Sequence, residues 1–104
     1  MKIYKFYADW CMPCKQLSKQ IDNTDLKDII QPINCDDDTE GLCEKYSIRN
    51  IPTVLIISDD GLELGRLVGA ISINKIREKI SECEEAEIKY FGEYKSKVLN
   101  NEIN

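Results

Sequence analysis

Two cysteines three positions apart are the residues of this chain best suited to chemistry. Cys11 and Cys14 stand in residues 9–15 (DWCMPCK), directly after a strand-like segment. A thiolate is the species that attacks a disulfide, so such a pair needs a means of stabilising negative charge on sulfur. If Cys11 begins a helix, the unpaired amides of the first turn face its sulfur, and Cys14 lies close enough to bridge. The spacing predicts a reversible dithiol in which Cys11 attacks and Cys14 resolves.

Zinc sites use the same spacing, and two packed, inert thiols are a third interpretation. A structural zinc site needs further cysteines or histidines nearby, and the chain has no histidine. Cys35 and Cys43 are separated by seven residues and are not a second close pair. Residues 36–38 (DDD) lack the glycine-centred loop and closing glutamate of a calcium site, so we expect a solvated turn there. Redox chemistry without a metal or organic cofactor is favoured.

Five cysteines cannot all pair within one chain. In a reducing cytosol the other three are expected to stay free, and a free cysteine behaves as a small, buried hydrophobe. Cys43 and Cys83 fall on the inward faces of predicted helices, so we expect both in the core. Cys35 is expected to be a packed strand residue, with a regulatory thiol as the alternative.

The segments on either side of Cys11 predict a strand followed by a helix. Residues 3–8 (IYKFYA) are rich in β-branched and aromatic types, which favour a strand that brings Cys11 to its carboxyl end. The following residues favour a helix, because Leu17 and Ile21 repeat four positions apart. Pro13 would stand in the first helical turn, where its missing N–H donor matters little.

A second strand and a short helix follow. Residues 30–35 (IQPINC) predict a strand parallel to the first, because a helix would connect the two. Pro32 indicates the start of this strand or an unpaired edge. Asp38 or Thr39 is then expected to cap a short helix that reaches Tyr46.

The remaining elements are a hairpin and a helix. Residues 54–57 (VLII) form a continuous apolar run, as in a central strand buried on both faces. Residues 60–61 (DG) favour a tight primed turn, which would pair this strand with residues 62–68. Ser72 is expected to cap a helix over residues 73–83, whose apolar positions recur at steps of three and four.

This order, βαβα followed by ββα, predicts an α/β fold with a four-stranded mixed sheet flanked by helices. We assign residues 1–83 to this domain and residues 84–104 to a carboxyl-terminal extension. Apolar residues recur there at helical spacing, so the extension should be a helix that docks on the domain and frays near its end. These positions are Ile88, Phe91, Tyr94 and Val98.

Composition excludes several classes of protein. At 104 residues the chain has the length of a single domain, and no apolar run approaches the roughly 20 residues needed to span a bilayer. A net charge of −5 without a basic cluster argues against nucleic acid as a partner. Residues 1–7 alternate charged and apolar types, unlike a signal peptide, so we expect a cytoplasmic monomer that binds no membrane.

Three stretches with compatible spacing resemble the thioredoxin family: residues 10–15 (WCMPCK), 46–53 (YSIRNIPT) and 68–70 (VGA). The resemblance covers residues 3–83. It implies a thioredoxin-like fold in three layers, and a cis peptide bond before Pro52 where the alternative is an ordinary trans turn. It also implies reduction of protein disulfides, with a thioredoxin-reductase-like enzyme or a thiol pool as the electron donor.

The resemblance further implies a shallow apolar surface around Cys11, where a substrate peptide pairs with the backbone at Ile51. Broad substrate tolerance would follow, because backbone pairing does not read side chains. For Trp10 the alternative is plain packing in the core. The implied substrate-binding residues are Trp10, Met12, Pro13, Ile51, Pro52, Thr53, Val68, Gly69 and Ala70.

Three features depart from the family pattern. Only two residues precede the first strand, where a thioredoxin usually has a further strand and helix, so we expect a smaller sheet. Lys5 stands where thioredoxins usually have a buried acid, and Pro32 where the lysine partner of that acid is expected. A cationic Lys5 would stabilise a thiolate and a buried neutral one would accept a proton, whereas one that extends to water would do neither. Met12 replaces the usual glycine.

The favoured function is a thiol–disulfide oxidoreductase that reduces protein disulfides through Cys11 and Cys14. A glutaredoxin-like electron donor, for example to ribonucleotide reductase, is an alternative that the short amino terminus allows. A third possibility is a binding module in which the dithiol is incidental, and residues 84–104 keep this alternative open.

Overall fold

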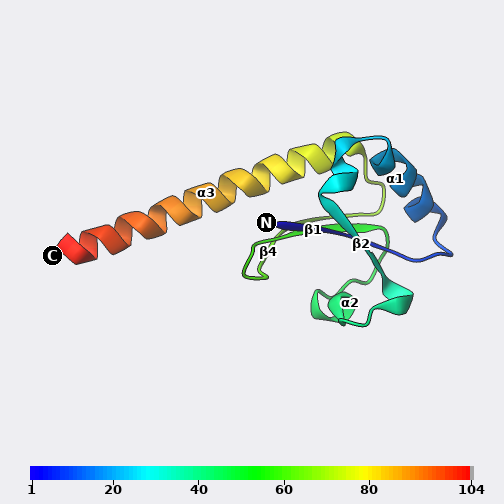
Figure 1. Cartoon of the computed structure of the whole chain (residues 1–104), viewed down its shortest axis with the longest axis horizontal. Helices are drawn as coiled ribbons and strands as arrows, with labels where there is room; N and C mark the ends of the chain where they lie inside the picture. Colours follow the sequence, from blue (N-terminus) through cyan, green and yellow to red (C-terminus); the bar gives the residue numbers. More distant parts are fainter. Residues whose placement is uncertain (104) are drawn as a thin grey trace.

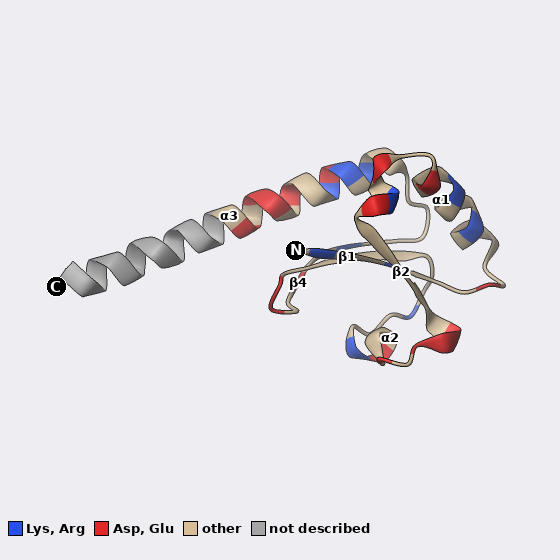
Figure 2. Cartoon of the chain, in the orientation of Figure 1, with Lys and Arg blue, Asp and Glu red and all other residues tan. Residues whose placement is uncertain are grey.

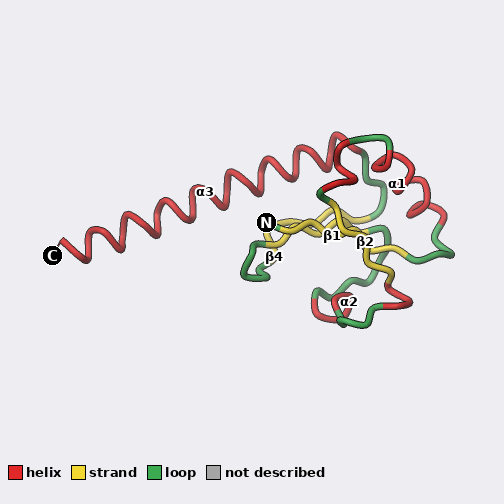
Figure 3. The backbone as a smooth tube through the Cα atoms, viewed as in Figure 1, coloured by secondary structure: helices red, strands yellow, loops and turns green. Residues whose placement is uncertain are grey.

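A mixed sheet of four strands forms the centre of the molecule (Figures 1 and 3). This computed structural model describes the backbone of residues 1–103 and the side chains of residues 1–88. The strand order is β2-β1-β3-β4; β1 is parallel to β2 and antiparallel to β3, and β3 is antiparallel to β4. The predicted α/β fold and mixed sheet are confirmed. The strands are β1 Lys2–Tyr7, β2 Ile30–Asn34, β3 Thr53–Ile57 and β4 Glu63–Val68.

Helices cover both faces of this sheet and complete the three predicted layers (Figure 1). On one face, the sheet residues Ile3, Val54 and Ile56 pack with apolar side chains of α1 and α3. On the other face, Phe6 and Leu55 pack with Tyr46, which caps the carboxyl end of α2. The helices are α1 Met12–Asp22, α2 Leu42–Lys45 and α3 Ile73–Ile103, with short 3-10 turns η1 Asp25–Asp28 and η2 Cys35–Asp37.

The strand β3 is buried along its full length, as its continuous apolar sequence predicts. It lies between β1 and β4, so neither of its edges is free. The strand β2 lies at the edge of the sheet, where Pro32 is aligned with Lys5 of β1. Proline has no backbone N–H to donate, and an edge strand tolerates this because one of its sides has no neighbouring strand to bond.

The turn between β3 and β4 differs from the predicted one. A primed two-residue turn requires positive φ at one or both central residues, and type I′ requires it at both. Gly61 has a φ of 87°, but Asp60 is not in that region. Instead the Gly61 N–H donates to the Ser58 carbonyl (2.9 Å), and the Ser58 N–H donates to the Leu62 carbonyl (2.8 Å). The hairpin therefore closes through a longer loop, and the expected tight primed turn is wrong.

The capping predictions for the later helices hold. The Ser72 hydroxyl accepts the Lys75 N–H (3.2 Å) at the start of α3. The Asp38 carboxylate accepts the N–H groups of Leu42 and Cys43 (3.0 and 2.7 Å), although α2 is shorter than predicted and Gly41 occupies its N-cap position. Each side chain pairs backbone donors that would otherwise be left open at a helix start.

The helix α3 packs closely on β4 through its first three turns. Ile76, Ile80 and Cys83 are buried there, as the helical spacing predicts. Gly65 of β4 lies directly beneath the helix, because a Cβ atom at this position would stand 3.0 Å from the Cys83 sulfur. A glycine thus allows the helix and the strand to approach.

The division of the chain at residue 83 stays a prediction, although α3 continues to Ile103 without a break. Ile88, the first apolar position of the predicted extension, is 73% exposed. Phe91, Tyr94 and Val98 lie outside the residues whose side chains are described. Within the described part of the chain, no helix is both long enough and apolar enough to cross a membrane.

Ile76 is fully buried between α3 and the sheet, so its truncation should destabilise the domain. We expect Ile76→Ala to lower the free energy of unfolding by about 2–5 kcal/mol, because a cavity is left in a packed core. The matched control, Ile88→Ala on the exposed part of the same helix, should change it by less than about 0.5 kcal/mol. Urea unfolding followed by circular dichroism measures both. Equal losses in the two variants would contradict this account of how α3 is held.

Candidate active site

The strand β1 leads directly into the dithiol. After β1 the chain turns so that the Cys11 N–H donates to the Ala8 carbonyl (3.1 Å), and α1 begins one residue later. Cys11 occupies the N-cap position of α1, and Cys14 lies in the first turn of this helix. The two form a disulfide with Cα atoms 5.2 Å apart. The sequence prediction of a bridging pair at a helix start is therefore confirmed.

A backbone amide of α1 donates to the Cys11 sulfur. The Cys14 N–H donates to Cys11 Sγ (3.3 Å), and the first turn of α1 contains no acidic residue. Lysines follow along this helix, as the blue segments of α1 in Figure 2 show. Negative charge on Cys11 would thus be stabilised by a hydrogen bond and by the positive end of the helix dipole. Both sulfurs are shielded, since Cys11 is 4% and Cys14 is 1% exposed.

The loop before β3 completes the surroundings of the dithiol. The Ile51-Pro52 peptide bond is cis, as the resemblance implies. Cys11 Sγ lies 3.9 Å from the Ile51 carbonyl oxygen, and the Gly69 N–H donates to the Pro52 carbonyl (3.0 Å). The Thr53 side chain is buried and donates to the Asn50 carbonyl (2.6 Å), so it holds the loop and does not line its surface.

Apolar side chains form an exposed rim around this site. Trp10 is 72% exposed, which rules out plain packing in the core. Its indole Nε1 donates to the Asp36 carboxylate (2.9 Å). In the sequence, Asp36 indicates only a solvated turn, and nothing local links it to Trp10. The other exposed rim residues are Met12, Pro13, Val68, Gly69 and Ala70.

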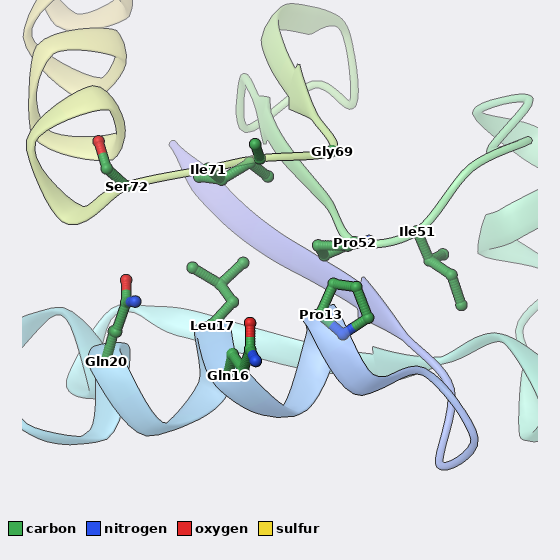
Figure 4. A pocket seen from close by; sticks show the side chains of 10 residues that line it. Pro13, Gln16, Leu17, Gln20, Ile51, Pro52, Gly69, Ile71 and Ser72 are labelled. Atoms are coloured by element: carbon green, nitrogen blue, oxygen red, sulfur yellow. The ribbon is translucent and has the colours of Figure 1, made fainter.

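A pocket of about 520 Å³ opens beside the loop, between α1 and the segment that leads into α3 (Figure 4). Gln16 and Gln20 project from α1 on one side, and Ser72 lies on the other. These polar residues were not predicted from the sequence, because the outward face of an amphipathic helix ordinarily faces only solvent. The remaining lining residues are Pro13, Leu17, Ile51, Pro52, Gly69, Ala70 and Ile71.

Lys5 is buried beneath α1. It is 7% exposed, and its Nζ donates to the Ser18 hydroxyl (2.5 Å) and lies 5.5 Å from the centre of the Tyr7 ring. The interpretation in which Lys5 extends to water is therefore wrong. Ser18 follows Cys14 by four positions and so lies one turn along the same side of α1. Burial lowers the pKa of the Lys5 ammonium below its usual range, while the Asp22 carboxylate acts in the opposite direction.

Cys35 and Cys43 form a second disulfide, with Cα atoms 6.1 Å apart. The expectation that Cys35, Cys43 and Cys83 all stay free is thus wrong, as is the expectation of Cys43 as a core residue, because both members of the pair are half-buried. The turn η2 reverses the chain after β2 and brings the two residues together, which their spacing alone does not reveal. Cys83 is a buried free thiol as predicted, and burial raises its pKa.

Among the residues whose side chains are described, no three His, Cys, Asp or Glu side chains gather into a group that could hold a metal ion. The chemistry available at Cys11 and Cys14 is exchange between a dithiol and a disulfide. Such exchange needs a thiolate, a second thiol within reach and access for a partner disulfide. The start of α1 favours a thiolate, and the spacing of the pair brings a second thiol within reach. The exposed rim beside the shielded Cys11 is where a partner disulfide would approach.

A family model described as Thioredoxin matches residues 1–82. The chain belongs to the thioredoxin family. The thioredoxin of Chlorobaculum thiosulfatiphilum is 40% identical over 81 residues, which cover 74% of this chain and 73% of that protein. Reduced Schistosoma mansoni thioredoxin pre-protein superposes with a TM-score of 0.65 at 31% identity, covering 77% of this chain and 75% of that one. Fasciola hepatica thioredoxin gives a TM-score of 0.64, also at 31% identity, covering 76% of each chain.

Membership of the thioredoxin family implies thiol–disulfide oxidoreductase activity, with protein disulfides as substrates and a reductase or thiol as the electron source. A wheat (Triticum aestivum) relative, 36% identical over 73 residues, is a chloroplastic M-type thioredoxin; the match covers 66% of this chain and 41% of that protein. Some relatives of this chain are therefore chloroplastic. The cytoplasmic location of the present chain stays a prediction.

Replacing Lys5 by methionine should raise the free energy of unfolding at neutral pH, because methionine fills similar space without a buried ammonium. A lowered pKa means that the folded state binds this proton less readily than the unfolded chain does. The wild type therefore gains stability as pH rises from the folded pKa towards the ordinary value of 10.5. The advantage of Lys5→Met should accordingly shrink as pH rises through that range.

Urea unfolding of the oxidised protein at several pH values measures this difference. Lys2→Met on the same strand is the matched control, because Lys2 is exposed. The difference in unfolding free energy between Lys2→Met and wild type should not change with pH. A stability difference for Lys5→Met that stays constant up to pH 10.5 would contradict a buried amine with a lowered pKa.

Proposed function

We propose that this thioredoxin-family protein reduces disulfides of other proteins, with Cys11 as the attacking and Cys14 as the resolving residue. The observation that carries the proposal is the disulfide at the start of α1, whose Cys11 sulfur accepts the Cys14 N–H beside the cis-Pro52 loop. In the reduced protein the same N–H would stabilise a Cys11 thiolate, which is the nucleophile that disulfide exchange requires.

The reaction has two exchange steps. The Cys11 thiolate attacks one sulfur of the substrate disulfide, forming a mixed disulfide and releasing the other sulfur as a thiolate that takes up a proton. Cys14 loses its proton and attacks the Cys11 sulfur, which releases the second substrate thiol and leaves the Cys11–Cys14 disulfide. Two electrons have then passed to the substrate, and a reductase or thiol returns the pair to the dithiol.

The rim supports docking of an extended substrate segment. The Ile51 carbonyl oxygen lies next to Cys11 Sγ, so a peptide that pairs with the loop backbone would hold its own sulfur near the nucleophile. Exposed Trp10, Met12 and Val68 offer apolar contact around it. The pocket lined by Gln16, Gln20 and Ser72 begins at Pro52 and extends along α1. We assign it to substrate residues that flank the disulfide.

Lys5 has the position and environment of a proton acceptor for the resolving step. Its Nζ donates a hydrogen bond to the Ser18 hydroxyl. Ser18 lies one helical turn beyond Cys14 on the same side of α1. Burial favours the neutral amine, which can accept a proton. We assign Lys5 to tuning proton release from the dithiol, in the place where other thioredoxins have an acid.

Turnover of insulin disulfides with dithiothreitol as the electron source tests the roles of the two cysteines. Wild type should accelerate the reaction, and Cys11→Ser should reduce the rate to that of dithiothreitol alone. Cys14→Ser should form a mixed disulfide with the substrate that accumulates, because the second attack is lost. Cys83→Ala is the matched control and should keep wild-type turnover, since Cys83 is buried between α3 and β4 in a different apolar cluster from Cys11.

Other outcomes would identify the alternatives. A Cys11→Ser variant as active as wild type would contradict the proposal and favour a binding module. Efficient turnover with glutathione as the only electron source would favour a glutaredoxin-like donor.

The role of Lys5 is tested by single-turnover reduction of insulin by the reduced protein across a range of pH. Wild-type rates should rise as Lys5 loses its proton, whereas in Lys5→Met that rise should be shifted to higher pH. Lys2→Met should follow the wild-type profile. Superimposable profiles for Lys5→Met and wild type would remove Lys5 from the mechanism while leaving the roles of Cys11 and Cys14 intact.

A further inference from the structure

The second disulfide lies outside the reactive site but next to its rim. Cys35 is the first residue of η2, and Cys43 lies in the first turn of α2. Both are half-buried, in contrast to Cys83, so a small reagent can reach them from solvent. The residue after Cys35 is Asp36, which accepts the indole N–H of Trp10.

We propose that Cys35 and Cys43 are a second reversible redox site, whose reaction partners are small uncharged thiols and disulfides, and whose state is transmitted to Trp10 through Asp36. This inference goes beyond the proposed function, because it involves neither Cys11 nor Cys14.

The disulfide ties the turn η2 to a fixed point. The Asp38 carboxylate accepts the N–H groups of Leu42 and Cys43, which holds the start of α2 whether or not the bridge is closed. When the bridge is closed, Cys35 is joined to this held segment. When it is open, η2 is held by local bonds such as that from the Asp36 N–H to the Asn34 side chain (3.0 Å). Opening therefore frees η2 locally and leaves the sheet in place.

Two contacts connect η2 and its bridge to the reactive site. The first is the hydrogen bond from Trp10 to Asp36, which holds the indole ring in one orientation at the rim. The second is packing: Cys35, Cys43 and Ile51 all pack against the same apolar cluster around Phe6 and Leu55, and Ile51 also packs against the cluster that contains Cys11. A change in η2 thus reaches the rim at Trp10 directly and the loop at Ile51 through packing.

Charge selects the kind of reagent. Asp36, Asp37 and Glu44 flank the two cysteines and are exposed, and the ribbon between β2 and α2 in Figure 2 carries the red of acidic residues. Anionic thiols such as glutathione would be repelled from such a surface at low salt, whereas uncharged reagents would not. We therefore assign uncharged small thiols and disulfides, rather than anionic ones, as the favoured reaction partners of Cys35 and Cys43.

Oxidation of Cys35 and Cys43 takes two exchange steps. One of the two thiols, as its thiolate, attacks an uncharged disulfide RS–SR, which forms a mixed disulfide and releases RS⁻. The other thiolate attacks the mixed disulfide, which closes the Cys35–Cys43 bond and releases a second RS⁻. Two electrons pass to the reagent, and the two protons from the cysteines convert its halves to RSH. A dithiol in excess reverses both steps.

The chain offers a clean way to test the pair, because Trp10 is its single tryptophan. We would use the full-length Cys11→Ser/Cys14→Ser variant, in which Cys35, Cys43 and Cys83 remain. The reduced protein is titrated with 2-hydroxyethyl disulfide, free thiols are counted by alkylation and mass spectrometry, and Trp10 emission is recorded. We expect loss of two of the three thiols without added reagent mass, a shift in Trp10 emission, and reversal of both by dithiothreitol.

Two further variants on the same background separate closure of the Cys35–Cys43 disulfide from its effect on Trp10. Cys35→Ser should lose the ability to close a bridge, so its remaining surface thiol, Cys43, would form at most a mixed adduct. Asp36→Ala should keep the loss of two thiols but lose the emission change on oxidation, because the link to Trp10 is cut. Oxidised glutathione should react more slowly than the uncharged reagent at low salt, and the gap should narrow as salt is added.

Failure of the pair to close, or stable mixed adducts alone, would overturn the reversible site. Closure with unchanged Trp10 emission would overturn transmission, as would an emission change that persists in Asp36→Ala. None of these outcomes depends on disulfide reductase activity, since the reactive pair is absent from every variant used. The inference and the proposed function can therefore fail separately.

Discussion

The buried strand β3 holds the three segments of the reactive site in register. Thr53, its first residue, is aligned with Phe6 of β1 on one side and with Val68 of β4 on the other. The chain that leads to Cys11, the loop with cis-Pro52 and the segment after β4 therefore meet at one end of the sheet. The site depends on this strand more than on any contact between its own side chains, because a shift of one residue would move all three segments apart.

Burial of Lys5 gives this site a different polarity from that of thioredoxins with a buried acid at the same place. A buried carboxyl group is stable in its neutral form when it holds a proton, whereas a buried amine is stable in its neutral form when it lacks one. In the proposed role, Lys5 would therefore begin as a neutral base that accepts a proton, whereas a buried acid in its neutral form already holds one. Ser18 supplies the polar contact that a lone amine in this position needs.

The elements with strong periodic patterns were predictable from sequence. The continuous apolar run of β3, the repeat of Leu17 and Ile21 in α1 and the cap at Ser72 each correspond to a local physical requirement, and all three are confirmed. The Cys11–Cys14 pair was predictable for the same reason, since both residues lie within one helical turn. Such features need no knowledge of how distant segments approach.

Features that depend on distant segments were not predictable. The bridge between Cys35 and Cys43 requires the reversal at η2, and the pairing of Trp10 with Asp36 requires two segments separated by 26 positions to meet. The predicted turn type of the hairpin was wrong for a local reason, because a glycine after an aspartate fits more than one kind of turn. The polar side of the pocket was missed because Gln16 and Gln20 look like ordinary solvent-facing helix residues.

The position of Cys83 bears on how this protein would behave when it is stored or refolded in air. Five thiols in a small domain invite scrambled pairing and covalent aggregates. Here four of the cysteines form two disulfides. The fifth, Cys83, is buried between α3 and Gly65 of β4. An oxidised molecule consequently presents no sulfhydryl to its neighbours. Packing makes the unpaired Cys83 inaccessible, so the folded, fully oxidised chain should remain free of intermolecular disulfides.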